Sequence, residues 1–294
     1  MAKKKKKNVN IYTYKFALPA LVIYTVMFLI PTVLGIFTSF TEWNIRDLYH
    51  LSFNGLDNFI KIFKDVNFIL AIKNTFLFAV VSTVVKVVFA VLLALALTKK
   101  LKTCNFLRSI FYIPSILSGV VVGLIFTSFF KMGGMFDQVL KLFGYHGNIV
   151  WLGNSATAML CVIWTDIWKG TGFAMMIFIA GLQAIPSDYQ EAAAIDGAVG
   201  LKRFFYITLP LLMPSFTIVI TSSLIAGLKI FDNVLILTGG GPGFATQVLG
   251  TYVYKNFNAG FLGKSSAMSL VLTVIVCTCT MGLNKFMRSK EVEA

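Results

Sequence analysis

Two charged side chains interrupt an apolar stretch of the sequence, the segment WTDIWKGTGF at residues 164–173. Asp166 and Lys169 are three residues apart, so on a helix they share a face and can form an ion pair. A charge inside a membrane costs roughly 2.5–3.5 kcal/mol on insertion scales, and it therefore usually faces a cavity or a partner. The pair is predicted either to line a solute pathway or to be an internal salt bridge. Lys86, in another apolar run, is predicted to be paired or to face a cavity, and the sequence identifies no partner for it.

Residues for metal or nucleotide chemistry do not occur in recognisable patterns. The two histidines, His50 and His146, are far apart, and no group of cysteine and histidine supplies a set of metal ligands. The tripeptide GKS at 263–265 ends like a Walker A loop, but position 258 is Asn258 rather than Gly and no strand is predicted before it. The chain is therefore predicted to bind no metal, to be no enzyme, and not to hydrolyse ATP by itself.

Long apolar runs must position these residues. The chain of 294 residues is 57% hydrophobic and 13% charged, whereas a soluble domain carries about 25% charged residues. A helix needs about 20 apolar residues to cross a bilayer. Six runs meet this length: 16–40, 70–97, 106–130, 155–182, 211–237 and 265–287. We therefore predict an all-α integral membrane protein with six transmembrane helices.

The positive charges set the orientation of these helices. Most of the 26 lysine and arginine residues fall in segments that share one side of the membrane, among them Lys3–Lys7, Lys99–Lys100 and Lys202–Arg203. By the positive-inside rule, both termini and the 183–210 loop are predicted to be cytoplasmic. Orientation in a membrane accounts for the net charge of +14, so nucleic acid is not an expected partner, whereas membrane lipid is.

A polar segment, EAAAIDGAVGLKRFFYITLP at 191–210, separates the fourth run from the fifth. Ser187 and Gln190 in front of it fit a capping box, which predicts a helix start at 187. Alanines 192–194 favour helix, and Gly197 can take the left-handed conformation that ends one. A second short helix is predicted through 202–206. The result is a compact helix–turn–helix on the cytoplasmic surface. Its charged side chains are predicted to be exposed to a partner: Asp188, Glu191, Lys202 and Arg203.

The spacing of this segment resembles the EAA loop of ABC importer permeases. The matching positions are Glu191, Ala192, Ala193, Gly197, Ile207, Leu209 and Pro210. The flanking GLQAIPSDYQEAAAIDGA and FDNVLILTGGGP are similar to the carbohydrate-uptake branch, in particular to the larger membrane subunit of the maltodextrin importer, and also to glycerol-phosphate permeases. The resemblance covers about residues 16–288 and implies a type I ABC importer permease core with a cytoplasmic EAA coupling helix.

The resemblance implies that the chain is one of two membrane subunits, a heterodimer that works with two ATPase subunits and an extracytoplasmic solute-binding protein in a bacterial or archaeal cell membrane. ATP and Mg would bind the ATPase, and no cofactor is expected on this chain. The implied arrangement is a cytoplasmic N-terminus (1–15), a permease domain (16–287) with its coupling loop at about 186–210, and a tail (288–294). The coupling residues are expected to be Glu191, Ala192, Ala193, Asp196, Gly197, Ile207, Leu209 and Pro210. Glu191 is the candidate ionic contact to the ATPase, and closure of the ATPase would rotate the loop and move the attached spans.

Sugar contacts are implied on the spans before and after this loop. The matched positions are Asp166, Lys169, Gly170, Phe173, Ser223, Ala226, Gly227 and Ile230. Trp164 and Trp168 can stack on a sugar ring or simply fill helix interfaces. The maltose subunit has neutral side chains where this chain has Asp166 and Lys169, so the site is expected to differ in specificity. Alternatives are a permease for glycerol 3-phosphate or another polar solute, and an ion-coupled secondary transporter, which would want an inverted repeat that the sequence does not show.

Two other features favour structural explanations. Small residues follow one face of the third run at four-residue spacing and predict close helix packing, within the chain or across the heterodimer: Ser115, Gly119, Gly123 and Thr127. The external segment LTGGGPGFAT is predicted to be flexible, either as a contact for a binding protein or as a permissive turn.

Overall fold

The computed structural model describes residues 17–47, 49, 51–98, 102–144, 147 and 149–291. The basic N-terminal segment 1–15, Lys99–Lys100, His50, His146 and the last residues of the tail lie outside the described residues. Within the described part the regular secondary structure is helical, apart from two isolated bridges that join Thr41 to Phe53 and Asn44 to Asp47. The predicted all-α fold is confirmed.

The helices in chain order are α1 (Leu18–Tyr24), the π-helical segment η2 (Thr25–Leu29), α2 (Ile30–Thr38), α3 (Asp57–Lys64), α4 (Val66–Leu97), α5 (Cys104–Ile116), α6 (Gly119–Phe130), α7 (Met135–Leu142), α8 (Ser155–Ala184), α9 (Ser187–Ile195), α10 (Leu201–Arg203), the π-helical segment η3 (Phe204–Thr208), α11 (Leu209–Leu211), α12 (Met213–Leu228), α13 (Asp232–Leu237), α14 (Leu249–Asn258) and α15 (Leu262–Arg288). The two longest begin at side-chain caps. Asp65 accepts from the Asn67 amide at 3.0 Å before α4, and Asn154 accepts from the Ala156 amide at 3.0 Å before α8.

Four helices are long and apolar enough to cross a membrane by themselves: α1–α2, α4, α8 and α15. Two further spans are bent pairs, α5 with α6 at 99° and α10–α11 with α12 at 70°. The described chain therefore has six spans only if each bent pair counts as one. The prediction that the third and fifth apolar runs are each one continuous helix is wrong.

The break in the third run lies at Leu117 and Ser118, whose ψ angles of 144° and 143° are extended rather than helical. The fifth run stops at Leu228, and α13 begins only at Asp232. The two short helices that these interruptions set apart, α6 and α13, pack on each other. A Cβ at Gly123 would lie 2.9 Å from Ile236, so the glycines of α6 serve a contact within this chain.

Both π-helical segments end just before a proline. Pro31 and Pro210 have no N–H to donate to the carbonyl four residues earlier, and a proline ring also crowds that carbonyl. The turn widens accordingly: the amide of Ile30 bonds the carbonyl of Thr25, and the amide of Leu209 bonds the carbonyl of Phe204. The second of these widened turns lies inside the predicted coupling loop.

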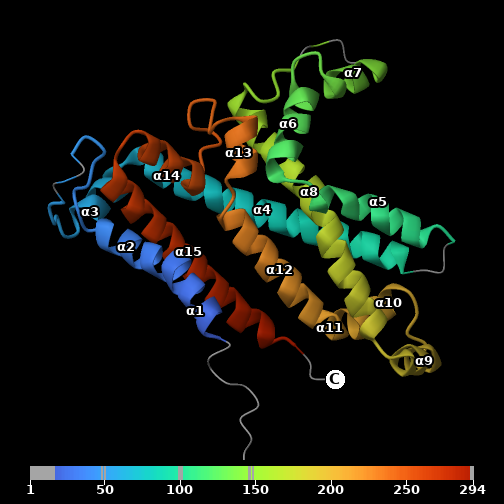
Figure 1. Ribbon diagram of the computed structural model, residues 1–294. Coiled ribbons are helices and arrows are strands. Elements are labelled where there is room, and N and C mark those ends of the chain that lie inside the picture. Colours follow the sequence, from blue (N-terminus) through green and yellow to red (C-terminus); the bar gives the residue numbers. More distant parts are fainter. Residues whose placement is uncertain are drawn as a thin grey trace, which may run out of the picture.

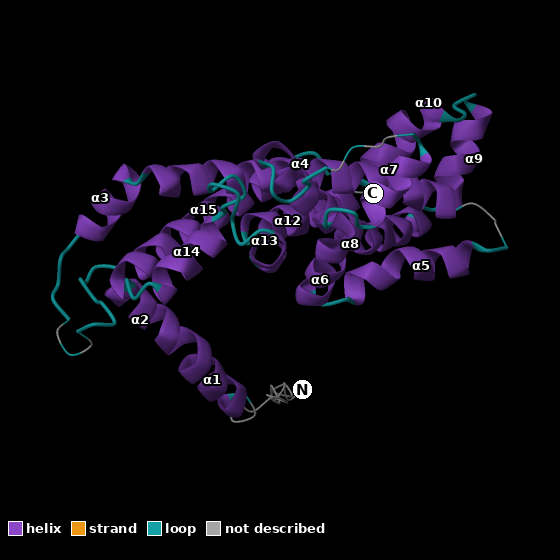
Figure 2. Ribbon diagram, turned by 90° about the horizontal axis from the view of Figure 1, so that it is seen from above, coloured by secondary structure: helices purple, strands orange, loops and turns teal. Residues whose placement is uncertain are grey.

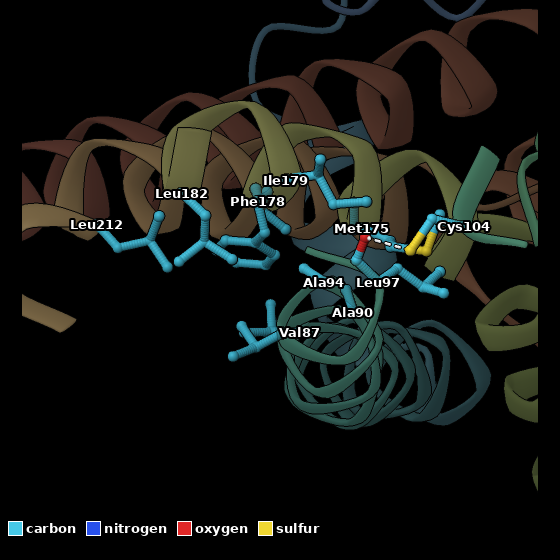
Figure 3. Close-up of a cluster of buried hydrophobic side chains, with 13 residues drawn as sticks. Val87, Ala90, Ala94, Leu97, Cys104, Met175, Phe178, Ile179, Leu182 and Leu212 are labelled. Atoms are coloured by element: carbon cyan, nitrogen blue, oxygen red, sulfur yellow. Dashed lines mark hydrogen bonds between the residues drawn. The ribbon is translucent and has the colours of Figure 1, made fainter. Parts of the chain in front are cut away.

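Helices α4, α8 and α12 form the centre of the bundle (Figure 1). Ala90 and Ala94 of α4 are fully buried, and such small side chains let α8 approach closely. Figure 3 shows Met175 and Phe178 of α8 lying in the same buried cluster. Helix α2 packs on α15 at the edge of the bundle, and most apolar side chains of α1 and α2 are exposed.

The two ends of the bundle differ. Helices α9 and α10 lie at one end and α3 at the other, in both views (Figures 1 and 2). At the α3 end, Ile62, Phe68, Leu249 and Met268 form a core that joins α3, α4, α14 and α15. The coupling segment thus lies at the opposite end of the molecule from this packed cap.

Candidate functional site

The coupling segment has the predicted helix and turn. Helix α9 begins at Ser187 and ends at Ile195, and Gly197 has a φ of +71°. The Gly197 amide donates to the Ala194 carbonyl at 3.2 Å, and the Ala198 amide donates to the Ala193 carbonyl at 2.8 Å. These two bonds form a Schellman motif, which needs a residue that tolerates a positive φ at its turn. The end of α9 is therefore a defined turn rather than a loose linker.

The predicted capping box is wrong. Helix α9 has no side-chain cap, because Ser187 is already its first helical residue and the preceding position is Pro186. The Ser187 hydroxyl contacts the Asp188 carboxylate at 3.4 Å instead of a backbone amide. The predicted start of the helix at residue 187 is correct, but the capping bond on which that prediction was based does not form.

The surface of the coupling segment mixes charge with exposed apolar side chains. Asp188, Glu191 and Lys202 are exposed as predicted, whereas Arg203 is partly buried. Ile195 at the end of α9 is 87% exposed. Further exposed apolar side chains follow in the same segment: Val199, Leu201, Phe205 and Tyr206. Uncovered apolar area of this kind marks an interaction surface.

The remaining coupling candidates divide by burial. Ala193 is buried beneath the turn, whereas Ala192 and Asp196 are exposed. Ile207, Leu209 and Pro210 are partly buried in the helical stretch that leads into α12. The segment therefore joins the end of α8 directly to the start of α12.

Asp166 does not pair with Lys169. Its Oδ2 atom lies 2.8 Å from the Nζ atom of Lys86 on α4, and the two side chains are 15% and 6% exposed. Among the described residues, Lys169 has no ion pair and is partly exposed. Gly170 makes room for the cross-helix pair, since a Cβ there would lie 2.8 Å from Cε of Lys86. Lys86, for which the sequence identified no ion-pair partner, is thus paired with Asp166.

The other predicted pathway residues fall into exposed and buried groups. Phe173 on α8 and Ala226 on α12 are exposed, and Ile230 is partly exposed just beyond α12. Ser223 is buried, and so is Gly227, where a Cβ would lie 2.8 Å from the Ala79 Cα of α4. Gly227 therefore brings α12 close to α4, and the structure does not bring all the predicted residues to one open surface.

The two tryptophans of α8 make aromatic contacts. The rings of Trp168 and Phe126 are 5.2 Å apart, and those of Trp164 and Phe89 are 6.5 Å apart. Five residues separate Trp168 from Phe173, which turns a helix by about 140°. The tryptophans consequently lie on a different side of α8 from Phe173. Each contacts one neighbouring ring, yet Trp164 stays 46% exposed and Trp168 40% exposed.

Ser115 contacts the backbone of α8 beside Lys169. Its hydroxyl donates to the Lys169 carbonyl at 2.8 Å and accepts from the Phe173 amide at 3.0 Å. Helix α5 can come this close because Gly172 has no side chain. A Cβ at this position would collide with the Phe111 carbonyl. The small residues were predicted to share one helix face. That face is not continuous, because Ser115 lies on α5 and packs on α8, whereas Gly119, Gly123 and Thr127 lie on α6.

The glycine-rich loop at 238–247 is held by hydrogen bonds, so the prediction of a flexible segment is wrong. The Asn74 amide nitrogen lies 3.2, 3.1 and 3.0 Å from the carbonyls of Phe244, Ala245 and Gln247. Thr246 is fully buried and donates to the Gly241 carbonyl at 2.6 Å. No sequence pattern predicts these bonds, because Asn74 is a single polar residue near the start of a long apolar run.

Lys264, within the GKS tripeptide, belongs to a polar cluster at the N-terminal end of α4. Its Nζ atom lies 3.2 Å from Oδ2 of Asp65, and the Tyr252 hydroxyl donates to the same oxygen at 2.7 Å. Burial raises the pKa of Asp65, but the hydrogen bonds from Tyr252 and Lys264 outweigh it and hold the pKa below its ordinary value. GKS is thus the start of α15, not a phosphate-binding loop.

Comparison with known proteins agrees with this architecture. Residues 86–290 match the family described as binding-protein-dependent transport system inner membrane component. The multiple sugar-binding transport system permease protein MsmF of Streptococcus mutans is 35% identical over 265 residues, which cover 90% of each chain. The sn-glycerol-3-phosphate transport system permease protein UgpA of Agrobacterium fabrum is 32% identical over 289 residues, 96% of each chain.

A solved structure shares the fold. It is a chain of a bacterial alginate ABC transporter in complex with an alginate pentasaccharide-bound periplasmic protein, with a TM-score of 0.81 and 24% sequence identity. The match covers 94% of this chain and 93% of that one. The fold is that of a type I ABC transporter permease. The chain belongs to the binding-protein-dependent transport system inner membrane component family, whose members are ABC importer permeases rather than enzymes.

Proposed function

We propose that this chain is one of two membrane subunits of an ABC importer for a sugar or oligosaccharide, driven by ATP hydrolysis on separate subunits. The observation that carries the proposal is the coupling segment: a short helix, closed by a Schellman turn at Gly197, projects at one end of the bundle with uncovered apolar and charged side chains. A sugar cargo is supported by the relative MsmF, whose name assigns it to a multiple sugar-binding transport system.

The coupling segment can move two spans at once. Helix α8 ends at Ala184 and α9 starts at Ser187, while α10, η3 and α11 lead into α12 at a 70° bend. Both α8 and α12 pack on α4. A push on α9 from a closing ATPase dimer would therefore shift α8 and α12 together against α4, which alternates access to a pathway lined by these spans.

The same proposal assigns the partners and the orientation. The coupling segment and both termini face the cytoplasm of a bacterial or archaeal cell, where a pair of ATPase subunits holds ATP and Mg. Glu191, exposed on α9, is the ionic contact to the ATPase. A second permease subunit completes the pathway, and an extracytoplasmic binding protein delivers the solute. The relative UgpA supports glycerol 3-phosphate as an alternative cargo. The fold, which is that of an ABC transporter permease, does not support the alternative of an ion-coupled secondary transporter.

The test is co-purification of the ATPase with charge-reversed variants of this chain. Glu191→Lys should lower ATPase recovery in detergent and abolish ATP-driven uptake in proteoliposomes. Glu42→Lys is the matched control, because Glu42 is also exposed but precedes α3 at the opposite end of the bundle. Equal ATPase recovery with both variants would contradict the assigned contact, and uphill uptake by the chain without an ATPase would contradict the proposed function itself.

A further inference from the structure

Three charged side chains lie within the membrane-spanning parts of α4 and α8 at the level where the two helices meet: Lys86, Asp166 and Lys169. Lys86 and Asp166 neutralise each other at 2.8 Å, and both side chains are largely buried. Each charge of this pair therefore has its countercharge within the chain. Lys169 is left as a cation with no ion pair among the described residues.

Lys169 faces the side of α8 that the chain's own helices leave open. Phe173, four residues on, is 50% exposed, and Met176 on the same side is also exposed. Residues three and four apart share a helix face, so Lys169 and Phe173 belong to one surface. An ionisable side chain inside a span is costly and marks a pathway for charged species or a partner of opposite charge.

Resting on the function proposed above, we propose that Lys169 selects for anionic solutes, so that the cargo is a sugar derivative with an acidic group, a carboxylate or a phosphate. An unneutralised ammonium attracts such a group and gives no comparable advantage to a neutral sugar. Lys86 acts as a positioning residue: it holds Asp166, which would otherwise be free to pair with Lys169 at i, i+3.

The test is a measurement of charge preference at Phe173 that needs no knowledge of the natural cargo. In the full transporter in nanodiscs, Cys104, Cys161, Cys277 and Cys279 are replaced by Ala and Phe173→Cys is introduced. The rates of modification by an anionic methanethiosulfonate (sulfonatoethyl) and a cationic one (trimethylammonioethyl) are then compared. With Lys169 present the anionic reagent should be favoured, and Lys169→Met should lower the rate ratio about tenfold, as expected for a unit charge one helical turn away in water.

Two further variants separate charge from structure. Lys86→Met should lower the ratio as well, because Asp166 becomes free to neutralise Lys169. The double variant Lys86→Met/Asp166→Leu should retain the original ratio, because it removes the pair and leaves Lys169 alone. A ratio that Lys169→Met does not change overturns the inference while the pathway stands. A cysteine that reacts with neither reagent in any nucleotide state shows instead that no water reaches this face, so the proposed pathway fails with it.

Protection of the introduced cysteine identifies the acidic group. Galacturonate and glycerol 3-phosphate are the acidic probes, and galactose at the same concentration is the neutral one. Protection by galacturonate alone assigns a carboxylate, and protection by glycerol 3-phosphate alone assigns a phosphate. Equal protection by galactose, or no protection by either acid, counts against an anionic cargo.

Discussion

Breaking the Lys86–Asp166 pair on one side should destabilise the protein far more than removing both partners. Removal of one member of a buried pair leaves an uncompensated charge and costs about 3–5 kcal/mol. The Lys86 side chain is 6% exposed and that of Asp166 is 15% exposed. Asp166→Leu, which leaves the more deeply buried Lys86 unpaired, should therefore cost about 4–5 kcal/mol, and Lys86→Met about 3 kcal/mol. Methionine also keeps the packing of the lysine stem against Gly170.

The double variant Lys86→Met/Asp166→Leu should return to within about 1–2 kcal/mol of the original stability, because no buried charge remains. The assay is reversible unfolding by SDS in mixed micelles, followed by the fluorescence of the four tryptophans. Lys61→Met is the control: it breaks a 2.6 Å pair with Asp57 whose side chains are 54% and 47% exposed, and it should cost less than about 1 kcal/mol.

Two results would refute this reasoning. If Asp166→Leu is as mild as Lys61→Met, Lys86 and Asp166 do not form a buried pair in the membrane. If the cost of the double variant equals the sum of the two single costs, the side chains stabilise the bundle independently rather than through each other.

Three other predictions concern the ends of the bundle. Gly197→Pro should abolish uptake while the chain still inserts, because proline fixes φ near −65° where the turn needs +71° and removes the amide of the Schellman bond; Gly282→Ala, at a helical position with open space around it, should leave uptake unchanged. Asn74→Ala should cost about 2 kcal/mol and speed limited proteolysis of the 238–247 loop, since three carbonyls lose their shared donor; an unchanged cleavage rate would mean that the loop is held by other bonds. The pKa of Asp65 is below its ordinary 3.8, so its contribution to stability is complete above that value and is lost as the pH falls through the lower folded pKa. Tyr252→Phe should move this loss to higher pH in acid unfolding curves, and a curve that does not move would show that the Tyr252 hydroxyl does not lower the pKa of Asp65.

The coupling segment could be predicted from sequence because its determinants are local. A left-handed glycine, alanines that favour helix and a proline after the second helical piece act over a few residues, and the observed Schellman turn and the π-helical segment before Pro210 follow from the same rules. The capping box failed by one residue, because the helix begins one position earlier than the pattern requires: Ser187 is its first helical residue and Pro186 occupies the cap position. The breaks in the third and fifth runs were not predicted, because both runs are largely apolar, and the contact of α6 with α13 joins residues far apart in the sequence.

The sequence alone determined that this protein is a bundle of membrane-spanning helices with a bent helical segment between the fourth and fifth apolar runs. Composition and short-range backbone geometry suffice for both, because a chain in lipid must satisfy its backbone hydrogen bonds within each helix. Only the tertiary structure decided which charges meet. Asp166 has a lysine three residues away, yet it pairs with Lys86, 80 residues distant. That choice depends on the close crossing of α4 and α8 beside Gly170, and this crossing leaves Lys169 without an ion pair among the residues that the structure describes.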